Sequence, residues 1–100
     1  MKQLIISPQV YDDLLDIKEY IAIDSEEEAA KVVSKILNDM ERISDFPDSG
    51  NLLSNKVRCD ARYRYIITYS YATIYRVESD AVYITNVLHL ARDFNALKFI

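Results

Sequence analysis

The sequence predicts an α+β fold, in which a helical hairpin from the N-terminal half packs on an antiparallel sheet from the C-terminal half. Two stretches in the first half repeat apolar residues at helical spacing. In the second half, residues 62–94 hold six of the eight tyrosines and alternate their side chains with the period of two that is typical of strands. One hundred residues suit one core, so we expect residues 1–100 to form a single domain.

The N-terminal half is expected to contain a short apolar strand, residues 2–6, followed by two helices. Ser7 and Pro8 suit the cap and first turn of a helix that runs to about Asp24. Ser25, followed three residues later by Glu28, forms a capping box for a second helix, which Pro47 ends. Each helix has one apolar face: Val10, Leu14, Ile17 and Ile21 in the first, and Ala29, Val33, Ile36, Leu37, Met40 and Ile43 in the second.

The C-terminal half is expected to contribute three strands, at residues 61–68, 71–78 and 81–90. Before them, residues 48–55 contain the only glycine and several small polar side chains, which is typical of a loop, and residues 56–59 either extend that loop or begin an edge strand. Short connections make the three strands antiparallel neighbours, and the last is apolar enough to be a central strand. In the first strand, one face is aromatic and the other partly basic: Tyr63, Tyr65 and Ile67 against Arg62, Arg64 and Ile66.

The net charge also differs between the helical half and the sheet half of the chain. Residues 1–50 hold 5 basic and 12 acidic side chains, a balance of −7, and residues 51–100 hold 7 basic and 4 acidic side chains, a balance of +3. A site for an anionic partner is therefore expected on the sheet half, and the helical half should repel nucleic acid. The single cysteine, Cys59, forms no internal disulfide, and no apolar run has membrane length, so a cytoplasmic protein is expected. We interpret Cys59 as a structural residue.

Several kinds of chemistry are excluded by composition. One glycine is too few for a phosphate-binding loop, and one histidine with one cysteine makes a zinc cluster implausible, so neither a metal nor another cofactor is expected. The candidates that remain are basic side chains and exposed tyrosines of the sheet half. The basic set is Arg58, Arg62, Arg64, Arg76 and Arg92, with His89.

Two segments resemble the RelE/ParE toxin superfamily. The closing run VLHLARDF at residues 87–94 is the more specific, and FPDSG at residues 46–50 also looks like that family. The resemblance implies the same order of elements, β-α-α-β-β-β, over essentially the whole chain. It also implies a toxin of a type II toxin–antitoxin pair, neutralised by a cognate antitoxin.

Within the superfamily, one branch cleaves messenger RNA on the ribosome with basic and aromatic residues of this sheet. Such cleavage needs a base for the ribose 2′-hydroxyl, a fixed cation for the phosphorane and an acid for the leaving oxygen. By resemblance, Arg64 and Arg92 fall where that branch carries basic side chains. The chain departs from the pattern at three other positions: Ile66, Ala72 and Lys98.

His89 is the remaining candidate for nuclease chemistry, because its ordinary pKa lies near 7. Its apolar strand context favours an orienting hydrogen bond to the turn before Arg92 over catalysis. For Arg92 itself, a structural ion pair with Asp93 is as reasonable as a functional role. Under the nuclease interpretation, the catalytic set is Arg64, Arg92 and His89.

The favoured interpretation is therefore a ParE-like toxin that binds DNA gyrase. There are two alternatives. The first is an enzyme, namely a RelE-like endonuclease that acts on the ribosome with mRNA, and the second is a binding module that has lost toxicity. We expect antitoxin on the uncovered sheet face and the helix–sheet seam, with acidic groups beside Arg62, Arg64 or Arg76. The partner-binding residues expected are Arg58, Arg62, Arg64, Arg76, Arg92, Leu97, Phe99 and Ile100.

Overall fold

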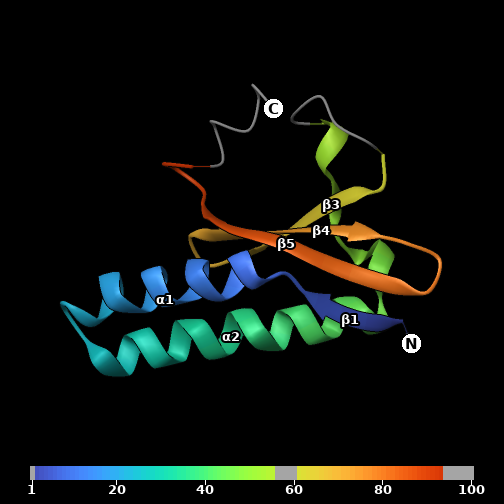
Figure 1. Ribbon diagram of the computed structural model, residues 1–100. Coiled ribbons are helices and arrows are strands. Elements are labelled where there is room, and N and C mark those ends of the chain that lie inside the picture. Colours follow the sequence, from blue (N-terminus) through green and yellow to red (C-terminus); the bar gives the residue numbers. More distant parts are fainter. Residues whose placement is uncertain (1, 56–60, 94–100) are drawn as a thin grey trace.

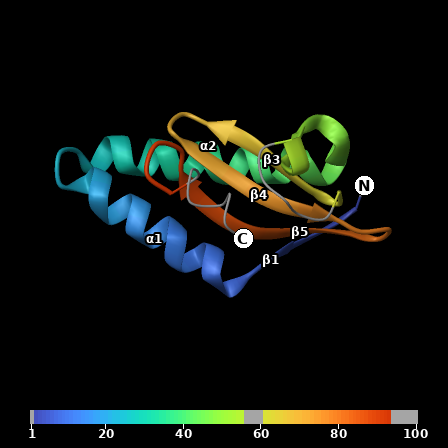
Figure 2. The same cartoon turned by 90° about the horizontal axis from the view of Figure 1, so that it is seen from above.

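Two helices and a twisted sheet form two layers in the computed structural model (Figure 1). The structure describes residues 2–55 and 61–93. Over these residues the α+β class and the predicted order of strands and helices are confirmed. The two helices lie side by side on one face of the sheet, and the view from above shows strands crossing over α2 (Figure 2).

Each helix begins at the serine that the sequence indicated. Helix α1 spans Pro8–Ala22, and the Ser7 side chain accepts a hydrogen bond from the Gln9 N–H. Helix α2 spans Glu26–Asp45, and the Ser25 hydroxyl accepts from the Glu28 N–H at 3.1 Å. These bonds satisfy N–H groups that have no partner inside a helix.

The apolar face of α2 differs in detail from the prediction. Val32 is buried, whereas the predicted Val33 is only partly buried and Leu37 is 37% exposed. Asp39 is also buried, between Ile36 and Ile43 on the helix surface. The helix is therefore rotated slightly from the position that its apolar residues alone suggest, because a polar contact with the sheet also determines its orientation.

The sheet has the order β1-β5-β4-β3-β2. Strand β1 (Gln3–Ile6) joins it parallel to β5 (Ala81–His89), and β5 pairs antiparallel with β4 (Tyr71–Val77). Strand β3 (Tyr63–Thr68) continues the antiparallel meander. The first strand thus lies at one edge and places β5 between two neighbours, which makes the last strand a central one, as predicted.

The predicted loop at residues 48–55 contains short regular elements. They are a 3₁₀ turn (Pro47–Ser49), strand β2 (Asn51–Leu52) and a second 3₁₀ turn (Leu53–Asn55). Strand β2 pairs antiparallel with Arg64 and Tyr65 of β3. Elements of two or three residues show no periodicity, which is why the sequence indicated only a loop.

The two faces of the sheet have different cores. Facing the helices, Tyr71, Tyr75, Val82 and Ile84 join the apolar residues of α1 and α2 in the main core. On the other face, a smaller cluster is formed by Leu53, Tyr65 and Ile74. The aromatic side of β3 thus faces away from the helices, and Ile66 packs toward them.

Candidate functional site

Arg64 is bound to the 46–50 segment. Its Nη1 atom donates to the Gly50 carbonyl at 2.8 Å and to the Asp48 carbonyl at 3.4 Å. The Asp48 carboxylate lies 3.7 Å from its Nη2 atom, and the Arg64 side chain is 23% exposed. The guanidinium therefore joins β3 to the segment before β2, so its donors are partly used within the fold.

On the face away from the helices, Arg76 lies between two tyrosines. The strand register places Tyr63, Arg76 and Tyr83 in a row across β3, β4 and β5. The guanidinium carbon is 4.8 Å from the Tyr83 ring centroid and 5.9 Å from that of Tyr63, which is cation–π geometry. The hydrogen bond to the Tyr63 hydroxyl is the largest cause that raises the pKa of Arg76, and the hydrogen bond to Glu78 adds to it, despite partial desolvation.

The carboxylate of Glu78 neutralises this basic surface locally. It accepts from Arg76 Nε at 2.7 Å and from Arg62 Nη1 at 2.9 Å. An acidic partner group beside either arginine would compete with Glu78. The predicted role of Arg62 and Arg76 in binding a partner stays a prediction. Such binding would have to replace the hydrogen bonds that these arginines form with Glu78.

The turn after β5 brings His89, Arg92 and Asp93 together. The His89 Nδ1 atom accepts from the Arg92 N–H at 3.3 Å, which is the orienting hydrogen bond expected from the sequence. Both guanidinium–carboxylate contacts between Arg92 and Asp93 measure 3.1 Å, and the hydrogen bond from Arg92 lowers the pKa of Asp93. The His89 ring meets the Tyr71 ring edge-on, with centroids 5.4 Å apart.

This turn borders a cavity of about 350 Å³ between α1 and the end of β5. Asp13, Asp16 and Tyr20 line it from α1, opposite His89 and Arg92. Among the described residues, none forms a hydrogen bond with both the Arg64 and the Arg92 side chains. Arg64 is bound beside β2, and Arg92 lies beside this cavity. The predicted nuclease residues Arg92 and His89 are thus brought together, and Arg64 is not joined to them.

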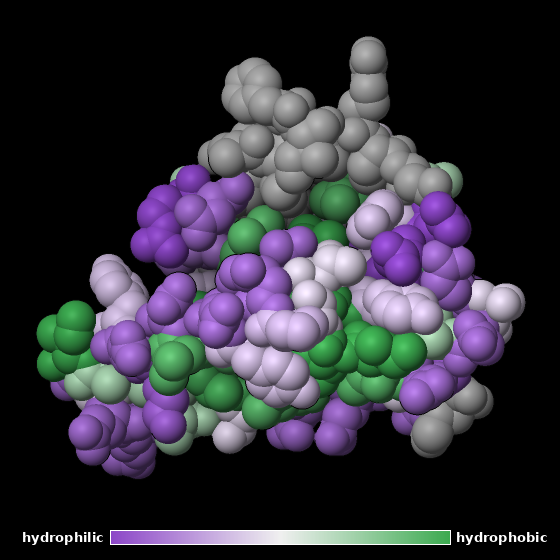
Figure 3. All heavy atoms as spheres, viewed as in Figure 1, coloured by the Kyte–Doolittle hydropathy of each residue, from purple (hydrophilic) through white to green (hydrophobic). Residues whose placement is uncertain are grey.

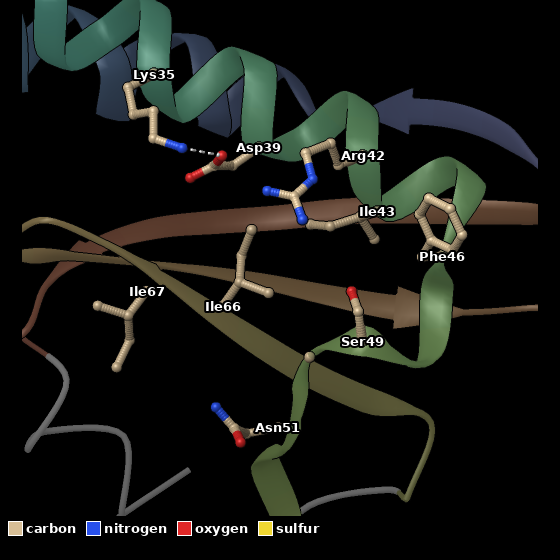
Figure 4. Close-up of a pocket in the computed structure, with 10 residues that line it drawn as sticks. Lys35, Asp39, Arg42, Ile43, Phe46, Ser49, Asn51, Ile66 and Ile67 are labelled. Atoms are coloured by element: carbon tan, nitrogen blue, oxygen red, sulfur yellow. Dashed lines mark hydrogen bonds and ion pairs between the residues drawn. The ribbon is translucent and has the colours of Figure 1, made fainter.

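A larger groove, about 490 Å³, lies between α2 and β3 (Figure 4). Lys35, Asp39 and Arg42 form its helical wall, and Ile66 and Ile67 form its strand side (Figure 4). The sequence interpretation did not include these residues as a site. The available signal was Asp39, a carboxylate that falls on the buried stripe of a helix.

Asp39 joins the helix to the sheet. One carboxylate oxygen accepts from Lys35 Nζ at 2.8 Å, and the other accepts from the Thr68 hydroxyl at 2.6 Å. Desolvation by burial raises the pKa of Asp39, but the hydrogen bonds from Lys35 and Thr68 act together with nearby positive charge and leave it below its usual value. The carboxylate is therefore held in its charged form.

The exposed surface seen in Figure 3 is mixed, with hydrophilic atoms over much of the helices and hydrophobic atoms gathered at the hairpin tip and near β1. Ile23, at the turn between the helices, is 81% exposed. None of the described helices is long and apolar enough to span a bilayer. Within residues 2–55 and 61–93, no group of three or more His, Cys, Asp or Glu side chains is placed to hold a metal ion.

Some predicted residues lie outside the described part of the chain. They are Arg58, Cys59, Leu97, Lys98, Phe99 and Ile100, together with the segment 56–59. Their predicted roles stay predictions.

The fold is shared with a toxin–antitoxin protein. A solved structure titled "Chromosomal ParDE TA system from P. aeruginosa" matches 90% of this chain and 97% of its own, with a TM-score of 0.74 and 18% identity. At that identity the likeness establishes the fold. No curated protein matches the sequence.

The family is established by the sequence itself. Residues 4–94 match the family described as "ParE toxin of type II toxin-antitoxin system, parDE". The match covers both helices and every described strand from Leu4 onward. This chain belongs to the ParE toxin family, which confirms the resemblance inferred from residues 46–50 and 87–94.

Proposed function

We propose that this chain is the toxin of a type II toxin–antitoxin module, that an antitoxin protein neutralises it, and that its target is DNA gyrase. The observation that carries the proposal is the ParE family match over residues 4–94. The module acts in the cytoplasm, where gyrase works on DNA. The protein acts by binding and breaks no bond itself.

The local geometry supports binding over RNA cleavage. Arg64, the cation that a nuclease would aim at a phosphate, donates instead to the Gly50 and Asp48 carbonyls. Ile66, in place of a second basic residue, packs against the main core, and Ala72 is fully buried. A cation that stabilises a phosphorane must be directed at it before the reaction begins.

RNA cleavage remains the second candidate because of the turn after β5. Arg92 keeps a 70% exposed side chain, and His89 lies beside it at the edge of a cavity. An exposed guanidinium next to an imidazole has the groups needed to contact a phosphate and to move a proton.

Two assays run in parallel test the choice. Purified protein is added to gyrase in a DNA supercoiling assay and to a translation reaction whose message is mapped by primer extension. We expect supercoiling to be inhibited and the message to stay intact. Codon-phased cleavage that Arg92→Ala abolishes, without any effect on supercoiling, would replace gyrase by mRNA as the target.

A matched variant tests whether the loss of any exposed positive charge has the same effect. Lys18→Ala removes an exposed positive charge from α1, at a residue that does not line the cavity beside the turn after β5. It should inhibit supercoiling as the wild-type protein does. If neither assay responds to the wild-type protein, the third interpretation, a binding module that has lost toxicity, is favoured.

A further inference from the structure

Where β5 extends past the end of β1, its outer edge is closed. Past the end of β1, the outward N–H groups of β5 are taken by carboxylates: Val87 donates to Asp13 Oδ2 at 3.0 Å, and His89 donates to Asp93 Oδ2 at 3.4 Å. Covered strand edges do not pair with a further strand. A partner strand is therefore not accommodated beside this end of β5.

The opposite edge, along β3, is covered only in part. Strand β2 pairs with Arg64 and Tyr65 and goes no further. The next residue to face that side is Ile67, and the residue opposite it in this register would be Ser49. Ser49 instead lies in a 3₁₀ turn, where its N–H donates to the Phe46 carbonyl at 3.0 Å.

The direction of the Ile67 backbone groups follows from the pairing with β4. The Val77 N–H donates to the Arg62 carbonyl at 3.0 Å, so Arg62 faces β4. Backbone groups alternate in direction along an antiparallel strand, so Ile66 and Thr68 also face β4 and Ile67 faces outward. Among the described residues, no strand pairs with the N–H and C=O of Ile67.

These two groups lie at the groove between α2 and β3, whose helical wall is positively charged. Two cations, Lys35 and Arg42, face one carboxylate, Asp39. Lys35 and Thr68 already bind that carboxylate. The Arg42 side chain extends from α2 into the groove (Figure 4) and forms no side-chain hydrogen bond or ion pair with residues 2–55 or 61–93. The groove thus offers one cation to an incoming anion.

Two exposed apolar side chains border the same groove. Phe46 is 65% exposed at one end, and Ile67 is 53% exposed on the strand. Exposed apolar side chains next to an unpaired strand edge are the features that a partner strand uses, since its backbone pairs with the edge and its side chains fill the neighbouring pockets.

We propose that an extended segment of the antitoxin adds to the sheet beside Ile67, in line with β2, and that an acidic side chain of that segment pairs with Arg42. This inference rests on the proposed function, which supplies the antitoxin. The groove belongs to the helix–sheet seam expected from the sequence, but the cation used is Arg42 of α2 and not Arg62, Arg64 or Arg76. A helix in the groove would leave the Ile67 N–H and C=O unpaired, so an extended segment fits better.

The test uses the complex of this chain with the protein encoded by the adjacent open reading frame. Amide hydrogen exchange is followed at Ile67 in the free chain and in the complex, and we expect the complex to slow it about tenfold or more. Arg42→Glu should weaken binding about tenfold, because it replaces attraction by repulsion at the groove. Lys18→Glu, the same change of charge on α1, should alter the affinity less than about twofold.

Three other outcomes overturn the inference, and they are distinguishable. If the complex forms but Ile67 exchanges as before and Arg42→Glu binds like Lys18→Glu, the groove is wrong while the antitoxin partnership stands. If no complex forms, both the proposed partnership with an antitoxin and the proposed binding at the groove are wrong. If Ile67 becomes protected in the free chain as its concentration rises, a second copy occupies the edge instead.

Discussion

The Tyr75 hydroxyl accepts a buried hydrogen bond from the Gly50 N–H at 3.0 Å. The same hydroxyl donates to the Pro47 carbonyl at 2.8 Å, and the Tyr75 side chain is fully buried. Burial raises the pKa of Tyr75, so the phenol stays protonated and keeps its hydrogen to donate. This one side chain of β4 holds both ends of the turn between α2 and β2.

Tyr75→Phe should lower the free energy of unfolding by about 1–3 kcal/mol, because it leaves the Gly50 N–H and the Pro47 carbonyl without their partner. Chemical denaturation monitored by circular dichroism measures the change. The control is Tyr69→Phe. It also removes a tyrosine hydroxyl, but from a residue that is 53% exposed. Equal effects of the two variants would contradict the role assigned to Tyr75.

The same relationship explains why residue 50 is glycine. A Cβ atom at Gly50 would overlap the Tyr75 hydroxyl oxygen and would lie 2.9 Å from the Tyr65 carbonyl oxygen. Gly50→Ala should therefore destabilise the protein by about 1–3 kcal/mol through overpacking. In the Tyr75→Phe background the cost should be smaller, because part of the obstruction is gone; strict additivity in this double-mutant cycle would argue against it.

Two threonines on the helix-facing side of the sheet should respond in opposite ways to the same substitution. Thr68 donates its hydroxyl to Asp39 at 2.6 Å, whereas the buried Thr73 hydroxyl has no hydrogen-bond partner among the described residues. Thr68→Val should destabilise by about 1–3 kcal/mol, and Thr73→Val should stabilise by roughly 1 kcal/mol. Thermal unfolding of the two variants provides the comparison, and a shift of the same sign in both would contradict the assignment.

Much of the fold follows from local pattern, and much of the site does not. Ser7 and Ser25 predict the starts of their helices, because a helix cap depends on residues only two or three positions away. The partners of Arg64 lie 14 and 16 positions earlier in the chain, at Gly50 and Asp48, in a segment without periodicity. Its use as a structural donor therefore depends on how the chain folds back.

The groove was missed for a related reason. Helical periodicity indicates which face of α2 is buried, but not which strand lies opposite it or how far that strand is paired. Arg42 becomes a candidate only once β2 is seen to begin at Asn51, opposite Tyr65, which leaves Ile67 of β3 unpaired on that side. Asp39 was the one clue in the sequence, since a carboxylate on a buried stripe needs a partner across the interface.

Stability at low pH should depend on Asp39. Its pKa in the folded protein is below its unfolded value, so ionisation contributes stability at pH values above the unfolded pKa. That contribution is lost as the pH falls from about 4 through the folded pKa. Asp39→Asn should reduce this loss; we expect its unfolding free energy to change less between pH 5 and about pH 3 than that of the wild-type protein.

Denaturant titrations at a series of pH values measure this dependence. Thr68→Val is the companion variant, because it removes one of the two hydrogen bonds that hold the carboxylate charged and leaves the one from Lys35. Its pH dependence should lie between those of the wild-type protein and Asp39→Asn. If Asp39→Asn loses as much stability as the wild-type protein over this range, another group controls the acid response.

The last prediction separates structural from functional arginines. Arg64→Ala should lower the free energy of unfolding by about 1–2 kcal/mol, because its hydrogen bonds to backbone carbonyls are lost, and this corresponds to roughly 4–16 °C in melting temperature for a domain of this size. Arg92→Ala should leave the melting temperature unchanged, since its side chain is 70% exposed and its ion pair with Asp93 is open to solvent. Gyrase inhibition, measured at a temperature where both variants are folded, should fall for Arg92→Ala and persist for Arg64→Ala. If Arg64→Ala is as stable as the wild-type protein but no longer inhibits gyrase, then Arg64 acts in binding. Its hydrogen bonds to the 46–50 segment would then contribute little to stability.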